Sequence, residues 1–285
     1  MLHARYRRIL LFFTNVLVSV IFWDILLPRI GFAKWARNTR SERLRKIAIR
    51  YRSLAVQMGG VLIKVGQFLS ARVDVMPGEV TEVLAGLQDE VPSEPFEAIC
   101  SVVESEFDMP ILDKFLEFES EPLAAASLGQ AHLGLIRITR EQAEKLHAMD
   151  KIKEVNGDIS YPVVVKIQRP HIEDIIATDL AAIKTVGGWI KRYPPIRKRA
   201  NIPGLIGEFT RVLYEEIDYL AEGRNAETFA ANFSDDPEVL VPKVIWTHTT
   251  KRVLTLEDVR GIKITDYDAI TAAGIDKAEV ASRLL

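Results

Sequence analysis

The sequence predicts an α+β fold in which an antiparallel sheet with its helices follows a long helical extension. Apolar residues recur at helical spacing through roughly the first 120 residues. β-Branched and alternating runs then mark strands over 126–138 and 161–168, and a second strand pair over 240–261. Long amphipathic helices separate the two strand pairs, an order typical of α+β architecture.

The composition is that of a globular protein able to bury a core. Of 285 residues, 48% are hydrophobic and 27% charged. The single cysteine, Cys100, cannot form an internal disulfide, and the five histidines lack the spacing of zinc ligands. We therefore expect no metal site in this chain and a reducing, cytosol-facing location.

Charge is divided unevenly along the chain. Residues 1–52 hold twelve Lys or Arg and two acidic residues, a net charge of +10, and the remainder carries −12. The apolar run Ile9–Trp23 follows Arg5, Arg7 and Arg8, and its fifteen residues are fewer than the roughly 20 that span a bilayer. An interfacial helix on the cytoplasmic side of a membrane, peripheral or shallowly inserted, is one interpretation, and a helix packed against the protein is the other. Nucleic acid is not an expected partner.

Three helices are expected in the extension. The first spans 39–76, with a break or close approach at Gly59-Gly60, and two more cover 78–91 and 93–107. This divides the chain into a membrane-proximal segment (1–38), a helical extension (39–120) and a lobe that contains the sheet (121–285).

In the lobe, the spacing of apolar residues predicts the helices that lie between the strands. Residues 139–160 keep a helical period up to an Asn-Gly turn and predict an insertion within a β-hairpin. Two long helices, 172–193 and 202–233, are expected on either side of Pro194-Pro195, and a last helix ends the chain.

Lys166 is the first residue that indicates chemistry, because it closes the apolar run "VVVK". An unpaired ammonium there would be costly to bury, so it needs an anion or a route to water. The later stretch "EEIDYLAE" offers the four carboxylates of Glu215, Glu216, Asp218 and Glu222. A strand lysine paired with a helix glutamate is the arrangement that holds nucleotide phosphates in kinases. A lysine that simply reaches water remains the alternative.

A small-residue turn precedes this strand. It consists of Ala124, Ala125, Ala126 and Ser127, followed by Gly129. Methyl groups are small enough to let a phosphate approach, although alanine adopts positive φ less readily than glycine. By itself the pattern also fits an ordinary hairpin.

The helix "LIKVGQFL" adds Lys64 and Gln67, three residues apart and hence on one helix face, with Gly66 between them. Alone, such a pair is typical of a solvated polar face. Combined with the alanine turn, the strand lysine and the acidic helix, it is far more specific.

These stretches together resemble the UbiB/AarF (coenzyme-Q-type) atypical protein-kinase-like family over about residues 40–270. The matching segments, in order, are "KVGQ" (64–67), "AAAS" (124–127), "VVVK" (163–166), "EIDYLAEGRN" (216–225) and "LTLEDVRGIKITD" (254–266). The resemblance implies a kinase-like small lobe preceded by a helical KxGQ extension. It also implies ATP as cofactor and a link to isoprenoid quinone biosynthesis or membrane lipid metabolism.

The resemblance assigns roles to individual residues. Lys166 would hold the α/β-phosphates and pair with Glu222, or with Glu216 if the two glutamates exchange roles. Glu216 and Asp218 would hold Lys64 as gating ion pairs, which places Lys64 and Gln67 over the active site. The alanine turn and Gly129 would cover the phosphates, and Glu257 and Val259 would lie at the hinge beside the base.

The catalytic Asp and the Mg²⁺-binding stretches that the family places after the hinge do not occur before Leu285. The expectation is therefore a fragment without the large lobe, with Mg²⁺ binding only in the complete enzyme, so whether this chain is itself an enzyme stays open. The alternative is a non-catalytic nucleotide- or lipid-binding regulatory module at the membrane. A third reading, a helical adaptor built on residues 1–110, leaves the lysine and acidic stretches unexplained. Expected partners are a nucleotide, a membrane lipid or quinone-like small molecule and the membrane surface, and a homodimer is compatible with these.

Overall fold

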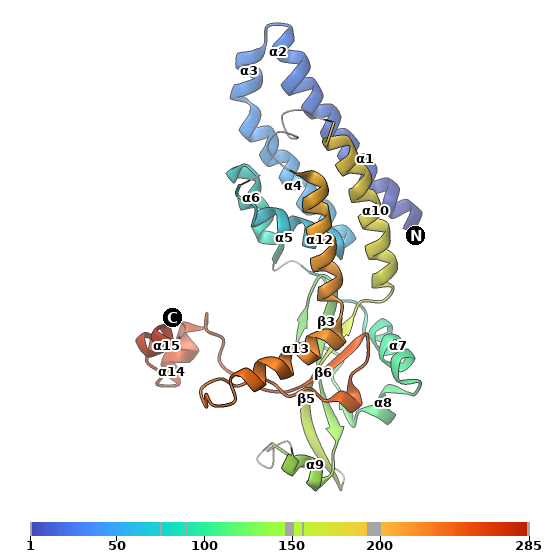
Figure 1. Ribbon diagram of the computed structural model, residues 1–285, viewed down its shortest axis with the longest axis vertical. Coiled ribbons are helices and arrows are strands. Elements are labelled where there is room, and N and C mark those ends of the chain that lie inside the picture. Colours follow the sequence, from blue (N-terminus) through green and yellow to red (C-terminus); the bar gives the residue numbers. More distant parts are fainter. Residues whose placement is uncertain are drawn as a thin grey trace.

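The computed structural model describes residues 2–74, 76–88, 91–145, 151–155, 157–192 and 201–283. A helical half stands above a half built on the sheet (Figure 1). The helices are α1 (Leu2–Val20), α2 (Leu27–Arg29), α3 (Ala33–Asn38), α4 (Arg40–Met58), α5 (Val61–Ser70), α6 (Gly78–Ala85), α7 (Phe96–Phe107), α8 (Ile111–Lys114), α9 (Arg140–Lys145), α10 (Ile172–Ile190), α12 (Ile202–Glu216), α13 (Tyr219–Asn232), α14 (Tyr267–Ala272) and α15 (Lys277–Arg283). The strands are β1 (Glu117–Phe118), β2 (Ala124–Ala125), β3 (Gly129–Arg137), β4 (Lys153–Val155), β5 (Asp158–Gln168) and β6 (Val253–Glu257).

One antiparallel sheet contains all six strands, in the order β1-β3-β5-β4, with β2 beside β3 and β6 beside β5. The α+β class is therefore confirmed, and the second strand pair is confirmed in part. Its first half forms a short antiparallel bridge from Val244 to Leu256, and a short helical turn, η3 (Trp246–His248), follows it. The second half is β6, which also pairs with β5.

The hairpin insertion is less helical than its sequence period predicts. Among the described residues, the helix α9 covers Arg140–Lys145, and β4, which lies where the helical period predicts helix, pairs with the start of β5 and lengthens the hairpin. The turn between β4 and β5 uses Gly157 at φ 88°, a conformation that favours glycine. Residues 146–150 and 156 lie outside the described residues. Tertiary pairing with β5 therefore overrides a weak helical period.

The helix expected over 202–233 is broken in two. Asp218 caps α13 by accepting a hydrogen bond from the Ala221 amide at 2.9 Å, so its backbone leaves the helical conformation. Ile217 is buried, and its carbonyl accepts a hydrogen bond from the Gln168 side chain at 2.6 Å. The chain consequently turns between α12 and α13, and α13 crosses the sheet (Figure 1). The expected break at Pro194-Pro195 lies outside the described residues.

Three apolar cores hold the molecule together. One lies between the sheet and α7–α8, and a second joins α1, α4, α5 and α6 to α10. The third lies among α5, α10 and α12, and includes Leu128 from the turn after β2. Helices α7 and α8 therefore pack with the sheet, although the boundary at residue 120 assigns them to the extension.

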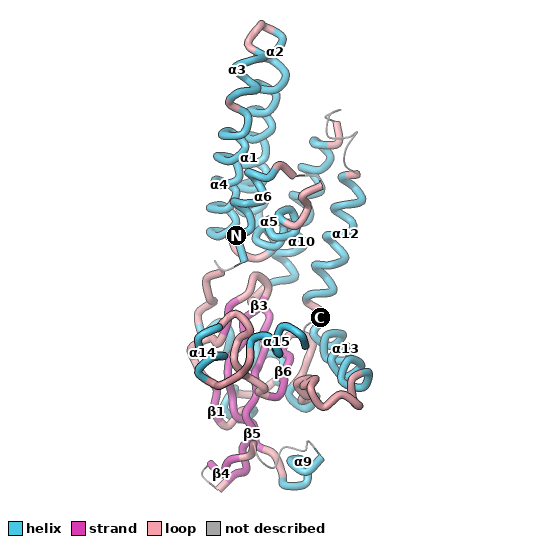
Figure 2. The backbone as a smooth tube through the Cα atoms, turned by 90° about the vertical axis from the view of Figure 1, so that its left-hand side faces the viewer, coloured by secondary structure: helices cyan, strands magenta, loops and turns pink. Residues whose placement is uncertain are grey.

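The N-terminal helix is longer than the apolar run. Helix α1 continues through a π-helical turn, η1 (Ile21–Leu26), into α2, giving 28 residues that are long and apolar enough to cross a membrane by length and composition alone. Together with α3 and α4 it forms a helical hairpin that projects from the molecule (Figure 2). Ile9 is buried in the core that joins this helix to α4 and α10, whereas nearly all other residues of the helix are half-buried or exposed. The interpretation as a packed helix is therefore confirmed for the face that carries Ile9, and the membrane interpretation stays a prediction.

A buried ion pair fixes α1 to the rest. The Arg5 guanidinium donates to Asp179 at 2.6 and 2.7 Å and to the carbonyls of Met58 and Gly59 at 2.6 and 3.0 Å. Asp179, on α10, is 0% exposed, and burial raises the pKa of its carboxyl while Arg5 lowers it. Removing the guanidinium would leave a buried carboxylate without its counter-ion.

We predict that Arg5→Met destabilises the protein by about 3–5 kcal/mol near neutral pH, the usual cost of breaking a buried pair. Without Arg5 the folded-state pKa of Asp179 rises further above its unfolded value. The folded protein then binds more protons than the unfolded chain, so the deficit shrinks as the pH falls toward that raised pKa. Urea unfolding at pH 7.5 and 5.5 measures both effects.

The matched control is Arg8→Met, because Arg8 lies on the same helix and contacts the side chain of Gln57 in an exposed hydrogen bond. A change within about 0.5 kcal/mol is expected for it, as for other surface substitutions. Equal losses in the two variants would mean that the Arg5–Asp179 pair does not hold α1 in place.

Candidate functional site

Lys166 lies in a row of paired residues that crosses three strands. Ala124 pairs with Ala131, and Ala131 with Lys166. Directly paired residues project from the same face of a sheet, so the turn alanine and the lysine share a face. On β5 the neighbours Val165 and Ile167 point instead into the buried core. The sheet therefore presents Lys166 on its half-open face.

Lys166 pairs with Glu222 from the first turn of α13. Its ammonium donates to both carboxylate oxygens, at 2.6 and 2.7 Å, and the two side chains are 37% and 40% exposed. The ammonium also lies 5.0 Å from the centre of the Tyr219 ring, which adds a cation–π contact. Of the candidate carboxylates, Glu222 is thus the one in contact with Lys166.

Tyr219 occupies the centre of the site. Burial, followed by the negative charges of Glu222 and Glu216, raises the pKa of its hydroxyl. Gly129 at the start of β3 makes room for it, since a Cβ there would lie 2.5 Å from the Tyr219 hydroxyl oxygen and 2.6 Å from the Ile167 carbonyl oxygen. Gly129 is therefore needed for close packing against Tyr219, and its φ lies outside the left-handed region.

The alanine turn between β2 and β3 is tight and partly buried. The Ala126 amide donates to the Gly129 carbonyl at 2.8 Å, which closes the turn. Ala124 and Ala125 form β2, whereas Ser127 is buried at 2% exposure. Its hydroxyl has no hydrogen-bond partner in the described part of the chain.

Arg169 holds the alanine turn in place through hydrogen bonds and an ion pair. Its guanidinium donates to the Ala126 carbonyl at 3.0 Å and to the Pro92 carbonyl at 2.5 Å, and it forms an ion pair with Glu94. The Glu94 amide in turn donates to the Gln130 side chain at 2.8 Å. A buried, multiply bonded arginine thus joins the segment before α7 to the turn.

Lys64, on α5, forms an ion pair with Glu216, the last residue of α12. Asp218 does not share this role as expected: its carboxylate caps α13 because it stands at the helix break. The two ion pairs, Lys64–Glu216 and Lys166–Glu222, therefore flank that break on its two sides.

Gln67 also departs from expectation. Its side-chain amide donates to the Leu87 carbonyl at 3.2 Å and so holds the short helical turn η2 (Gly86–Gln88). Gly66 lies beside it, where a Cβ would meet Leu87 Cδ1 at 2.3 Å and Tyr51 at 3.3 Å. Gly66 and Gln67 thus face other parts of the helical extension, whereas Lys64 reaches α12 through its ion pair.

The hinge residues lie at the end of β6. Burial alone would raise the pKa of the Glu257 carboxyl, but hydrogen bonds from Lys151 at 2.5 Å and from the Lys243 amide at 3.3 Å help hold that pKa below its ordinary value. The Glu257 side chain is therefore committed to Lys151, and only its backbone could face a ligand. Within the described residues, the Val259 amide donates no hydrogen bond.

The sequence analysis missed the half-buried apolar side chains on the face that carries Lys166. They are Leu133, Leu135, Val164 and Leu256. The alternation of buried and half-buried residues along β3 and β5 is the signal that could have identified them. Tyr219 and Arg169 gave no comparable signal. No cluster of three or more His, Cys, Asp or Glu suited to a metal occurs among the residues that the structure describes.

Comparisons with known proteins identify the family. A family model described as the ABC1 atypical kinase-like domain matches residues 86–285. The protein sll1770 of Synechocystis is 38% identical over 240 residues, which cover 84% of this chain and 37% of the relative. Protein ACTIVITY OF BC1 COMPLEX KINASE 7, chloroplastic, of Arabidopsis thaliana is 33% identical over 278 residues, covering 94% and 37%.

A solved structure, that of Rv3197 with erythromycin from Mycobacterium tuberculosis, is 24% identical and covers 81% of this chain and 52% of its own, with a TM-score of 0.47. The chain spans 37% of the length of each of the two curated relatives. Because the family model matches well over half of the chain, the resemblance drawn from the sequence is confirmed: the chain belongs to the ABC1 atypical kinase-like family.

Proposed function

We propose that this chain binds ATP on the half-open face of its sheet, as the small lobe of a kinase-like protein that acts on a small membrane-associated molecule. The observation that carries the proposal is the Lys166–Glu222 ion pair, which lies beside the alanine turn. A lysine held by a helix glutamate is poised to share its charge with phosphate oxygens.

The surroundings fit each part of a nucleotide. Leu133, Val164 and Leu256 supply apolar surface for a flat base. The Val259 amide, which has no hydrogen-bond acceptor among the described residues, would donate to a base nitrogen. At the other end, the small side chains of β2 leave space for phosphates next to Lys166. Bound ATP would supply the phosphoryl group, and this chain's residues would orient it.

The position of Lys64 favours a small molecule as the phosphoryl acceptor. It reaches from the helical extension to Glu216, one helix break away from Glu222. A second cation at this position adds positive charge on the phosphate side and narrows access for a large substrate. We infer that the acceptor is a small lipid-like molecule, such as an isoprenoid quinone precursor or a membrane lipid, rather than a protein side chain.

The hairpin tip supports a membrane location. Exposed apolar side chains gather where α2 meets α3, including Ile30 at 67%, Phe32 at 53% and Trp35 at 52% exposure. The Trp35 and Trp23 rings lie with their centres 4.8 Å apart and are tilted by 59°, and the exposed cations Arg29, Lys34 and Arg37 flank Trp35 in the sequence. Aromatic rings flanked by cations favour the headgroup region of anionic membranes. We infer that this tip inserts shallowly into a bilayer.

For the nucleotide site, we predict that Lys166→Met weakens ATP binding by about 10- to 100-fold, the equivalent of one charged hydrogen-bond group. Adenosine binding should change little, because the lysine contacts phosphates and not the base. Isothermal titration with ATP and adenosine measures both.

The control for this titration is Lys251→Met, which removes an exposed lysine paired with Glu173. It should leave both affinities unchanged. If Lys166→Met bound ATP as tightly as the parent while retaining its thermal stability, the proposed phosphate site would have to be abandoned.

For the second cation, we predict that Lys64→Ala leaves the fold intact and lowers the preference for ATP over ADP about two- to fivefold, the scale of one partly exposed charge interaction. Glu216→Gln should shift the preference the other way, because it releases Lys64 toward the nucleotide. Competition binding with ATP and ADP gives the ratio. Lys46→Ala, which breaks an exposed pair on α4, is the control. Identical ratios in parent and Lys64→Ala would remove Lys64 from the site.

For the membrane tip, we predict that Ile30→Ser/Phe32→Ser/Trp35→Ser largely abolishes co-sedimentation with vesicles rich in phosphatidylglycerol. Deletion of residues 1–30 should have the same effect. The control Ile262→Ser/Ile264→Ser alters apolar residues of similar exposure far from the tip. Unchanged co-sedimentation of the triple variant would exclude the tip as the membrane contact.

A further inference from the structure

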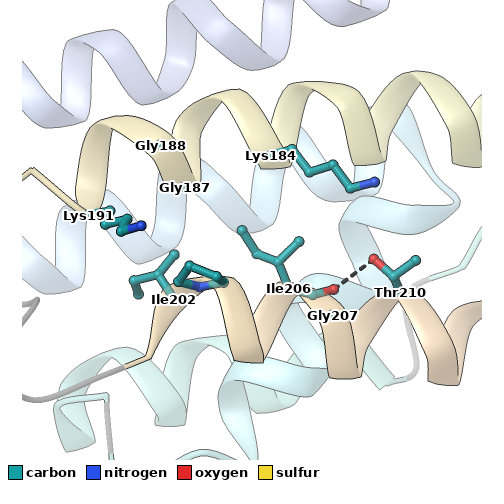
Figure 3. A pocket seen from close by; sticks show the side chains of 9 residues that line it. Lys184, Gly187, Gly188, Lys191, Ile202, Ile206, Gly207 and Thr210 are labelled. Atoms are coloured by element: carbon teal, nitrogen blue, oxygen red, sulfur yellow. Dashed lines mark hydrogen bonds between the residues drawn. The ribbon is translucent and has the colours of Figure 1, made fainter.

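The groove between α10 and α12 does not bring polar side chains to one point. Figure 3 shows Lys184 extending toward Thr210 and away from Lys191. The Thr210 hydroxyl donates a hydrogen bond to the Ile206 carbonyl of its own helix at 2.7 Å. Polar groups that act together are found behind the sheet, where buried residues of β3 belong to a connected network.

Gln130 and His132 lie on the face of β3 opposite Lys166. They are 2% and 0% exposed, and Ala131, which stands between them, pairs with Lys166 on the half-open face. Successive side chains of a strand project to opposite faces, so Gln130 and His132 point toward the side of the sheet that α7 covers. Two polar side chains buried beside an apolar core need hydrogen-bond partners there.

The two ends of this network fix the direction of every hydrogen bond in it. The Glu94 amide can only donate, and it donates to Oε1 of Gln130 at 2.8 Å. The Gln130 amide nitrogen therefore faces His132 Nε2, 2.8 Å away, and donates to it. At the other end the Glu119 carbonyl can only accept, so His132 Nδ1 carries the proton and donates to it at 2.8 Å. The network thus holds His132 as a neutral ring with its single proton on Nδ1.

The surroundings of the ring also favour its neutral form. Phe118 stacks on His132 with ring centres 5.3 Å apart, and Phe96 of α7 lies 6.0 Å away. Val165 is the partner of His132 on β5, and among the described residues the charged group that acts on the ring is the Glu119 carboxylate. Burial lowers the pKa of His132 below its ordinary value, although the Glu119 carbonyl and carboxylate oppose this in part. Protonation therefore requires a more acidic solution than an exposed histidine needs.

Arg169 connects this network to the alanine turn. The Glu94 carboxylate forms an ion pair with Arg169, whose guanidinium also donates to the Ala126 carbonyl at 3.0 Å. The Arg169 backbone amide donates to the Leu128 carbonyl at 3.0 Å. A continuous series of hydrogen bonds and one ion pair thus runs from His132 to two carbonyls of the turn.

Protonation of His132 is incompatible with this arrangement. A proton on Nε2 would face the amide nitrogen of Gln130, and two donors would then oppose each other at 2.8 Å. Rotation of the Gln130 amide would relieve this contact, but it would turn the same nitrogen toward the Glu94 amide, again donor against donor. Because a buried donor without an acceptor is costly, the segment that carries Glu94 would shift and displace Arg169 with it.

We propose that His132 is a proton-sensitive positioning residue for the alanine turn. Its neutral ring holds the turn through Gln130, Glu94 and Arg169, and protonation of the ring loosens the turn. The effect on nucleotide binding rests on the ATP site proposed above, whereas the loosening itself requires no nucleotide. Because the turn lies beside Lys166, a loosened turn would hold phosphates less well.

Hydrogen exchange of the nucleotide-free chain tests the loosening directly. The amides of Glu94, Ala126 and Arg169 each donate within the network or the turn, so their protection reports its integrity. Between pH 7.5 and 5.0 we expect their protection, corrected for the intrinsic exchange rate at each pH, to fall at least about fivefold. His132→Gln should keep its protection at both pH values, because its amide oxygen accepts from Gln130 and takes up no proton. Undiminished protection in the parent, or the same loss in His132→Gln, would overturn the proposal.

Gln130→Glu is a second variant, which should reverse the effect. A carboxylate there accepts hydrogen bonds from both the Glu94 amide and a protonated His132, so the charged ring becomes the favoured form. Protection of the three amides should then be higher at pH 5.0 than at pH 7.5. A loss on acidification like that of the parent would refute the assignment to His132.

The matched control is His248→Gln. His248 is half-buried, its Nε2 donates to the Lys114 carbonyl at 3.1 Å, and burial lowers its pKa to about 4. It contacts Phe115 and lies outside the network, so the variant should keep the pH dependence of the parent. Loss of that dependence in His248→Gln would assign the effect to a general response to acid and contradict the proposal.

Isothermal titration with ATP and adenosine measures the consequence for binding. Over the same pH range, the parent should lose about three- to tenfold more ATP affinity than His132→Gln, whereas adenosine affinity should change equally in both. The comparison cancels the protonation of ATP itself, which is common to both chains. Equal losses of ATP affinity would remove His132 from the nucleotide site. If exchange changed as expected but the parent bound no ATP at either pH, the ATP site would fall and the positioning of the turn by His132 would stand.

Discussion

The break between α12 and α13 is the constraint on which the candidate site depends. A continuous helix would point Glu216 and Glu222 in directions fixed by the helical repeat, six residues apart and on different faces. Because Asp218 restarts the helix, Glu216 ends one axis and Glu222 begins another. Each glutamate then meets a lysine from a different part of the chain, Lys64 from the extension and Lys166 from the sheet. The cap at Asp218 thus allows two ion pairs to form, one with the helical extension and one with the sheet.

The alanine turn depends on a second, buried constraint. A turn of small side chains has little packing of its own to hold it, yet Arg169 contacts Ala126 from one side and residues 92–94 from the other. Because a buried guanidinium must satisfy its donors, the carbonyls of Ala126 and Pro92 are held at fixed positions. The turn is therefore stiff for two reasons, the methyl groups of its alanines and the arginine beneath it. This differs from a glycine loop, which gains its reach from flexibility.

The sequence predicted the site best where a charged residue would be costly to bury without a counter-ion. Lys166 was found because an ammonium at the end of an apolar strand needs an anion, and its partner was narrowed to one acidic stretch. The break at Ile217–Asp218 was missed because the apolar period continues across it, so that Asp218 resembled an ion-pair partner rather than a cap. The prediction for Gln67 was wrong because helical spacing shows that Lys64 and Gln67 lie on one face of α5. It does not show which neighbouring residues that face contacts, and Gln67 contacts Leu87. The N-terminal helix was judged too short because Asp24 interrupts its apolar run, yet Asp24 pairs with Arg43 and the helix continues past it.

The helical half and the sheet half of the molecule are linked through α5 and α12. Helix α12 presents Glu216 at its last residue, and α5 carries both Phe68 and Lys64. Phe68 and Phe209 pack with ring centres 5.5 Å apart, so an aromatic contact and the Lys64–Glu216 ion pair both hold α5 against α12. Because protein interiors are close-packed, a displacement of α5 along α12 would disturb that ion pair. The distance between that pair and Lys166–Glu222 is spanned by Tyr219, whose ring contacts one pair and whose hydroxyl pKa is raised by both carboxylates. The packing of the helical extension thus has a physical route, through Glu216 and Tyr219, to the lysine that we propose for phosphate binding.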